Sequence, residues 1–172
     1  MIRRDPLANP EPLIRRVYAY VAYRIGDGPD AEDVTSNTFE RALRYRDSFD
    51  PRRGDAAAWL IGIARREIGT YFAQRRPAEI EREGSLDLAD DAHARLDLMA
   101  ALRALDDAER ELIALRYGAD LTARQIGEVV GRKTNAVEVA LHRTLAKLRH
   151  ELEPAPAPEP EPMRVPEATP AP

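Results

Sequence analysis

The side chains best suited to specific recognition lie in residues 121–149, where two short helical patterns meet at a glycine. Thr122 and Gln125 have the spacing of a capping box, which predicts the start of the first helix. Gly131 permits the tight turn that follows, and Lys133 leads into the second helix. Such an arrangement is typical of a helix-turn-helix, whose second helix enters the DNA major groove. The same pattern also occurs in helices that only pack together, so both interpretations stay open on this segment alone.

A second candidate set combines aromatic rings with arginines in residues 52–76. Trp59 and Tyr71 each fit an ordinary core or rim position when taken alone. Together with the surrounding arginines, they offer what single-stranded bases require: rings to stack on and cations along the phosphates. A loop beside such a surface could also hold a base flipped from the duplex. The arginines are Arg52, Arg53, Arg65, Arg66, Arg75 and Arg76.

The composition argues against catalysis and against metal binding. The 172-residue chain has no cysteine, and its histidines (His93, His142, His150) are not grouped with carboxylates at ligand spacing. There is no paired-carboxylate, Ser/His or phosphate-loop arrangement, so we expect neither enzyme activity nor a cofactor. No apolar run approaches the roughly 20 residues of a membrane span, and no signal-peptide core follows Met1. We therefore expect a soluble, cytoplasmic protein with no membrane insertion.

Helical periodicity predicts an all-α chain that positions these side chains. Three helices are expected in the N-terminal part: Pro12–Ile25, Asp30–Arg46 with Asp30 as N-cap, and Asp55–Arg76. The loop Asp47–Gly54 separates the last two. The third helix should bury one stripe, which consists of Ala57, Leu60, Ile61, Ala64, Ile68 and Phe72. Three helices with short connections predict a small bundle with its own core.

Helical periodicity resumes near Ala94, after an acidic stretch that contains proline and glycine. One helix through Leu105 and another, about Asp107–Tyr117 and capped by Asp106, precede the helix-turn-helix. The sequence thus predicts two small helical domains, 1–76 and 95–152, joined by a flexible acidic linker, 77–94. Eight of the 14 prolines lie in the last 20 residues, so 153–172 is expected to be a disordered Pro/Ala/Glu-rich tail.

The net charge of −4 hides an uneven distribution. Residues 1–76 carry a net charge of +3 and residues 101–150 carry +2. Residues 77–100 carry −5 and residues 151–172 carry −4. Two mildly basic blocks are therefore separated by an acidic connector and followed by an acidic tail, a pattern compatible with nucleic-acid binding by the blocks.

These pieces together resemble the small two-domain bacterial sigma factors of the extracytoplasmic-function (ECF) group, which direct RNA polymerase to promoters. The resemblance covers residues 8–150. It rests on AEDVTSNTFERALR (31–44), on FDPRRGDAAAWLIGIARR (49–66) with RR at 75–76, and on ALRALDDAERELIALRYGADLTARQIGEVVG followed by AVEVALHRTLAKLR (within 101–149). Three motifs in the family's order, with a linker at the expected place, are more specific than any one of them.

The resemblance implies three binding surfaces. The second helix would bind the coiled coil of the polymerase's largest subunit through Asp33, Asn37, Glu40, Arg41 and Arg44. The loop and third helix would melt the −10 promoter element and capture its non-template strand through Ser48, Phe49, Asp50, Arg53, Trp59, Arg65 and Arg66. The helix-turn-helix would read the −35 element as duplex through Arg132, Lys133, Thr134, Asn135 and Arg143.

Further partners follow from the same resemblance. The polymerase contact would extend to the flap region of the second-largest subunit, and the protein would join the nucleoid when it is part of the holoenzyme. Members of this family are often held inactive by a cognate anti-sigma factor, which makes such a protein a candidate partner.

Three positions depart from the family's usual pattern. Ser36–Asn37 replaces Gln-Glu, and Arg66 stands where an Asn commonly follows Ile-Ala-Arg. Glu138–Val139–Ala140 replaces Lys-Ser-Arg, which removes two cations from phosphate contact. We therefore expect the helix-turn-helix to bind DNA poorly until polymerase holds it in place.

Two other functions are compatible with parts of the pattern. A stand-alone helix-turn-helix transcriptional regulator would form a dimer and bind palindromic duplex without polymerase. A helical adaptor that does not bind DNA would be insensitive to charge reversal at Arg132 and Lys133.

Overall fold

The computed structural model describes residues 5–74 and 91–152, and all its regular elements in these two ranges are helical. The predicted all-α class is confirmed. Most of the expected linker and the whole expected tail lie outside the described residues. In the described part of the chain, no helix combines the length and apolarity needed to cross a membrane.

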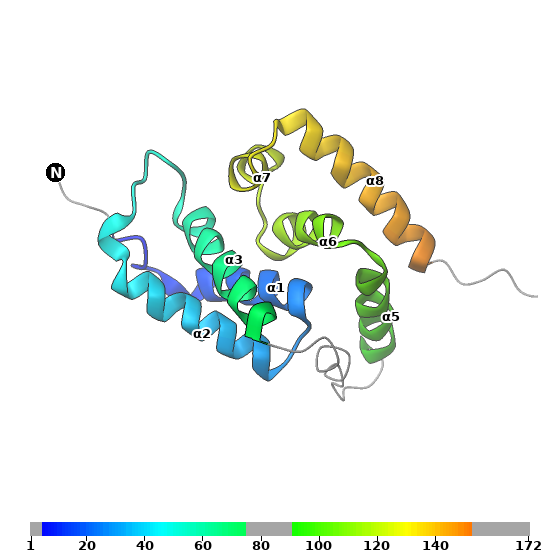
Figure 1. The fold of residues 1–172 in the computed structure, drawn as a ribbon, viewed down its shortest axis with the longest axis horizontal. Coiled ribbons are helices and arrows are strands. Elements are labelled where there is room, and N and C mark those ends of the chain that lie inside the picture. Colours follow the sequence, from blue (N-terminus) through cyan, green and yellow to red (C-terminus); the bar gives the residue numbers. More distant parts are fainter. Residues whose placement is uncertain (1–4, 75–90, 153–172) are drawn as a thin grey trace, which may run out of the picture.

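The N-terminal group consists of α1 (Pro10–Ile25), α2 (Pro29–Arg44) and α3 (Ala56–Gln74), which pack against one another (Figure 1). The stripe predicted for α3 is buried from Ala57 to Ile68, and only Phe72 at its end is half-buried. Val17 and Val21 from α1 and Val34 from α2 complete this core. The turn η1 (Arg46–Ser48) begins the long loop that leads to α3.

The first two helices both begin with a proline, slightly before the positions predicted. α1 begins at Pro10 rather than Pro12, and α2 begins at Pro29, so that Gly28 and not Asp30 is its N-cap. Proline is favoured in the first turn of a helix because its fixed φ suits the helix and its missing N–H would be unpaired there. Asp55 does act as a cap: its Oδ1 accepts a hydrogen bond from the Ala58 amide at 2.8 Å.

The C-terminal group consists of α5 (Asp91–Ala104), α6 (Asp107–Ile113), α7 (Ala123–Val130) and α8 (Thr134–Leu152). The predicted cap Asp106 is confirmed, in a capping box with Glu109. Where one helix to Tyr117 was predicted, the last turns widen into a π-helix, η2 (Ala114–Gly118). The Lys147 ammonium pairs with Glu109 at 2.7 Å and fastens α8 to α6.

The helix-turn-helix forms as predicted from α7 and α8. Thr122 and Gln125 make the capping box at the start of α7, and Gly131 ends this helix with φ of 70°. Gly127, which the sequence analysis did not single out, lies against the turn: a Cβ on it would sit 2.5 Å from the Arg132 carbonyl oxygen. The turn therefore depends on two glycines, one for its dihedral angles and one for its close packing.

The two groups pack directly against each other, with α1 lying along η2 and α6 (Figure 1). Gly118 makes this approach possible, because a Cβ there would lie 2.8 Å from the backbone of Tyr20. The Arg16 guanidinium donates to the carbonyl oxygens of Ala119 and Asp120, at 2.7 and 3.1 Å, and so satisfies the end of η2. The interface is thus built from backbone complementarity as well as from side chains.

Candidate nucleic-acid interface

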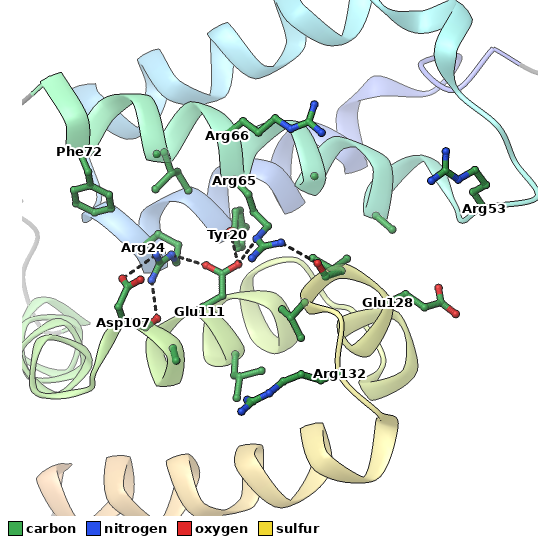
Figure 2. A pocket seen from close by; sticks show the side chains of 18 residues that line it. Tyr20, Arg24, Arg53, Arg65, Arg66, Phe72, Asp107, Glu111, Glu128 and Arg132 are labelled. Carbon is green, nitrogen blue, oxygen red and sulfur yellow. Dashed lines mark hydrogen bonds and ion pairs between the residues drawn. The ribbon is translucent and has the colours of Figure 1, made fainter.

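An open groove of about 1090 Å³ separates the N-terminal group from the helix-turn-helix (Figure 2). Arg53, Arg65 and Arg66 line it from the loop and α3, and Arg132 lines it from the turn before α8. Four of the twelve residues that the resemblance assigns to DNA thus lie around one groove. They do not converge on one point, since Arg66 and Arg132 extend away from each other in Figure 2.

One end of the groove is closed by a charged cluster, which we call the Arg24 cluster; it comprises Tyr20, Arg24, Arg65, Asp107 and Glu111. Arg24 has a side chain only 7% exposed, and it pairs with Glu111 Oε2 at 2.7 Å and Asp107 Oδ1 at 2.9 Å. It also donates to the Asp107 carbonyl oxygen at 3.1 Å. Figure 2 shows Glu111 between Arg24 and Arg65. Buried charges are tolerated when they are paired in this way.

Tyr20 completes the pairing of Glu111 from α1. The fully buried tyrosine donates its hydroxyl proton to Glu111 Oε1 at 2.9 Å. Burial strongly raises the pKa of Tyr20, and the negative charge of Glu111 raises it further. The hydroxyl therefore stays protonated and remains a donor to the carboxylate throughout the physiological pH range.

Among the residues predicted to contact the −10 element, Arg65 is one that joins the two groups of helices. Its Nε pairs with Glu111 Oε1 at 2.8 Å, and its Nη1 donates to the Val129 carbonyl oxygen at 2.9 Å. A neighbouring bridge runs from Gln125 Nε2 to Asp55 Oδ2 at 3.0 Å. The start of α3 and the first helix of the helix-turn-helix are therefore in direct contact.

Phe49, in the loop before α3, and Trp59, on α3, form an aromatic pair. The rings of Phe49 and Trp59 are tilted by 59° with centroids 5.5 Å apart, and both side chains are half-buried. Asp50 pairs with Arg52 at 2.9 Å, and this contact lowers the pKa of Asp50 to about 2. Ser48 is exposed, and its hydroxyl donates to the Tyr45 carbonyl oxygen. Because they are only half-buried, the rings of Phe49 and Trp59 present part of their π-faces at the surface.

Tyr71 does not belong to that surface. It lies twelve residues after Trp59 on α3, roughly 18 Å along the helix axis. Its hydroxyl donates to Asp30 Oδ2 at 2.8 Å, and its ring packs edge-on against Phe72. The candidate single-strand surface is therefore confined to the loop and the first half of α3.

The residues predicted to bind polymerase share the solvent face of α2. This face lies opposite the buried one, which contains Ala31, Val34, Thr35, Thr38 and Ala42. The exposed residues are Asp33, Asn37, Glu40, Arg41 and Arg44. Arg41 pairs with Glu67 of α3 at 2.9 Å and is still 49% exposed. The helix thus offers a continuous polar surface of mixed charge.

The residues predicted to read duplex DNA lie at the turn and along the outer face of α8. Arg132, Lys133, Asn135 and Arg143 are exposed, and Thr134 is half-buried at the first position of the helix. The opposite face holds Val137, Leu141 and Leu148 in the core, and Leu145 beside them is half-buried. The recognition surface and the core therefore occupy separate sides of one helix.

Sequence reasoning missed the residues that join the two groups. Arg16, Tyr20 and Arg24 follow one another at four-residue spacing, so all three lie on one face of α1. That face also carries Val17 and Val21, and a charged residue on an apolar face is a signal that a partner must cover it. The partners of Tyr20 and Arg24, Asp107 and Glu111, are also four residues apart. Within the described residues, no cluster of three or more His, Cys, Asp or Glu could hold a metal ion.

Comparison with known proteins identifies both groups. Residues 11–77 match the family model Sigma-70 region 2, and residues 101–150 match Sigma-70, region 4. The ECF RNA polymerase sigma factor BldN of Streptomyces coelicolor is 32% identical over 147 residues, which are 77% of this chain and 55% of BldN. The ECF sigma factor SigK of Mycobacterium ulcerans is 25% identical over 150 residues, 80% of each protein. The chain thus spans about half the length of BldN.

Solved structures agree with this assignment. The sigma factor RpoE from Bartonella quintana, in complex with the anti-sigma factor NepR, has the same fold, with a TM-score of 0.65 at 22% identity over 83% of this chain and 92% of that one. CnrH, in complex with the cytosolic domain of CnrY, gives a TM-score of 0.60 at 28% identity over 85% and 84%. The chain belongs to the ECF group of RNA polymerase sigma factors.

Proposed function

We propose that this chain is a promoter-specificity subunit, which binds core RNA polymerase and directs transcription initiation without chemistry of its own. One observation carries the proposal: a half-buried aromatic pair flanked by arginines and a helix-turn-helix occur in one chain, within the segments that match regions 2 and 4 of the family, respectively. The helix-turn-helix suits intact duplex, and the aromatic pair suits unstacked bases. A regulator that only binds duplex would have no use for the aromatic surface, so the stand-alone regulator is not favoured.

At the −10 element, Phe49 and Trp59 would stack on bases of the non-template strand once the duplex opens. Arg53 and Arg66 would follow the phosphates, since both are exposed and neither makes a side-chain ion pair or hydrogen bond within the described residues. Ser48, Asp50 and Arg65 would complete this surface. Arg65 can do so only after leaving Glu111 and Val129.

At the −35 element, the N-terminal end of α8 would enter the major groove. Arg132 and Lys133 would contact phosphates at its entrance, and Asn135 and Arg143 would face base edges or phosphates from the helix. Each phosphate contact contributes to the salt dependence of binding, so Lys133→Ala should reduce the slope of log K against log salt concentration by about one.

The solvent face of α2 would dock on the coiled coil of the largest polymerase subunit, with Asp33, Asn37, Glu40, Arg41 and Arg44 as contacts. The helix-turn-helix group would meet the flap region of the second-largest subunit. Both similar solved structures are complexes, one of them with an anti-sigma factor, which supports an anti-sigma protein as a further partner. In holoenzyme the chain would be found with the nucleoid.

Promoter reading requires the two groups of helices to separate. The −10 and −35 elements lie about 25 base pairs apart, roughly 85 Å along B-DNA at ~3.4 Å per base pair. In the structure, α3 and α7 touch through the hydrogen bond from Arg65 to Val129. The packed arrangement cannot span that distance, so polymerase binding must be coupled to opening of the Arg24 cluster.

The test is to add the purified chain to core polymerase and to score promoter-dependent initiation on a library of genomic fragments. Initiation at a shared bipartite sequence is expected. Binding to duplex by the protein alone, with no gain in initiation, would contradict the proposal.

A paired variant tests the assignment of the −10 surface. Changing Trp59 and Arg66 together to Ala should impair strand opening more than duplex binding by holoenzyme, because both side chains are assigned to the opened strand. Lys133→Ala is the matched control and should show the reverse pattern. Equal loss of both activities in the Trp59/Arg66 variant would mean that this surface only supports packing.

A further inference from the structure

The recognition helix exposes an apolar side chain that none of the assigned roles uses. Val139 is 52% exposed, and it lies on α8 directly opposite the buried stripe of Val137, Leu141 and Leu148. Residues four apart in a helix lie one above the other, so Asn135, Val139 and Arg143 form one exposed row. Val139 is therefore at the centre of the surface that would face DNA.

Neither folding nor solubility accounts for this valine. A β-branched residue loses rotamer freedom in a helix, and on an exposed helix face it is a poorer choice than alanine, lysine or glutamate. About half of the residue remains exposed to water, so burial of its side chain offsets little of this loss of rotamer entropy. A surface that binds phosphates would have a cation here, yet Glu138–Val139–Ala140 contains none.

The major groove offers one apolar group to such a side chain, the 5-methyl group of thymine. Asn and Arg, the neighbours of Val139 along the row, are the side chains that pair with adenine and guanine edges. Neighbours in the row are about 6 Å apart along the helix, at ~1.5 Å per residue, which is close to two base-pair steps. The row therefore has the chemistry of three base contacts, at about every second base pair, with an apolar one in the middle.

We propose that Val139 is a specificity-determining residue, which contacts a thymine methyl group in the −35 duplex between the positions faced by Asn135 and Arg143. The inference rests on the proposed sigma role and adds to it the chemical group that is read. The −35 preference would then depend on a methyl contact, made from a segment, Glu138–Val139–Ala140, that contains no cation.

Uracil isolates this contact, because it pairs like thymine and lacks only the methyl group. Holoenzyme formed with the full chain would be bound to a promoter identified in the initiation screen, with each −35 thymine of either strand replaced by uracil in turn. Loss of one buried methyl contact predicts a three- to five-fold weaker affinity at one position. With Val139→Ala, thymine and uracil should be bound equally there, and Val139→Thr, which retains one methyl group, should keep part of the discrimination. Leu152→Ala, an exposed apolar residue at the far end of α8, is the control and should discriminate as the wild type does.

Two outcomes would overturn the inference while the sigma role stands. One is initiation from a promoter at which no −35 thymine-to-uracil change weakens binding by the wild-type protein. The other is discrimination that Val139→Ala leaves intact, since another residue would then read the methyl group. Failure to initiate from any fragment would overturn the proposed function and this inference together.

Discussion

The Arg24 cluster and the groove beside it use arginine in opposite ways. Arg24 is buried and has two carboxylate partners, whereas Arg53, Arg66 and Arg132 are exposed and have no side-chain partner within the described residues. The first arrangement stabilises one fixed geometry, and the second leaves cations available to a polyanion. The residue type is the same, so burial and partners distinguish a structural arginine from a candidate DNA contact.

Arg65 stands between these two classes. It is 38% exposed, it pairs with Glu111, and it lies next to Arg66 in the chain. In the packed arrangement it belongs to the Arg24 cluster, and in an open arrangement it would join the DNA-facing set. Arg65 can therefore either pair with Glu111 or contact DNA, but not both at the same time.

The largest expected effect comes from Arg24→Ala. Removing one partner of a buried ion pair costs about 3–5 kcal/mol. We expect a loss near the lower end, about 3 kcal/mol, because Glu111 keeps Arg65 and Asp107 is largely exposed. Urea unfolding measures this change. Arg15→Ala, on the same helix but 74% exposed, is the control and should change stability by less than about 0.5 kcal/mol. Similar values for the two variants would mean that the cluster contributes no more than a surface pair.

A smaller effect is expected from Gly118→Ala. The added Cβ would lie 2.8 Å from backbone atoms of Tyr20, which cannot move aside as a flexible side chain can. Overpacking of this kind costs about 1–3 kcal/mol. Gly69→Ala, which has no atom within 4 Å of the new Cβ, should instead stabilise α3 by about 0.5–1 kcal/mol. Changes in unfolding free energy, relative to the wild type, that have the same sign in the two variants would contradict the close approach of η2 to α1.

The comparison of Arg65 with Arg66 tests the division between the two classes. Arg65→Ala should lower the unfolding free energy by about 1 kcal/mol, since the charge-assisted contacts that it loses are partly exposed. Arg66→Ala should change it by less than about 0.5 kcal/mol. Both should reduce promoter opening by holoenzyme, measured by permanganate reactivity of unpaired thymines. A stable Arg65→Ala protein would show that the contact with Glu111 contributes little in solution.

The sequence was sufficient where the determinants are local. The caps at Asp106 and Thr122, the turn at Gly131 and the buried stripe of α3 all depend on residues within a few positions of one another. The sequence was not sufficient to predict contacts that join distant segments. The apolar face around Arg24 signals that a partner must cover it, but only the fold shows that Glu111 and Asp107 are that partner. The role of Gly118 likewise depends on backbone atoms almost a hundred residues earlier. For the same reason the sequence predicted that Arg65 would bind DNA but gave no sign of its contact with Glu111.

The smallest effect concerns Arg52 and Arg53, which are adjacent and exposed but differ in their partners. The Arg52 guanidinium and backbone amide bond to Asp50, and they lower the pKa of that carboxyl from 3.8 to about 2. A depressed pKa means that the contact is fully formed above pH 4 and is lost as the pH falls through about 2. We therefore expect no change in this loop between pH 5 and 8, and an NMR titration of the Asp50 carboxyl carbon should have its midpoint near 2. Arg52→Gln should move the midpoint back toward 3.8, whereas Arg53→Gln, the control, should move it much less because Arg53 acts on Asp50 only through its charge. A wild-type midpoint near 3.8 would mean that Arg52 is not held by Asp50 in solution, and Arg52 would then have to be counted with Arg53 among the cations available to DNA.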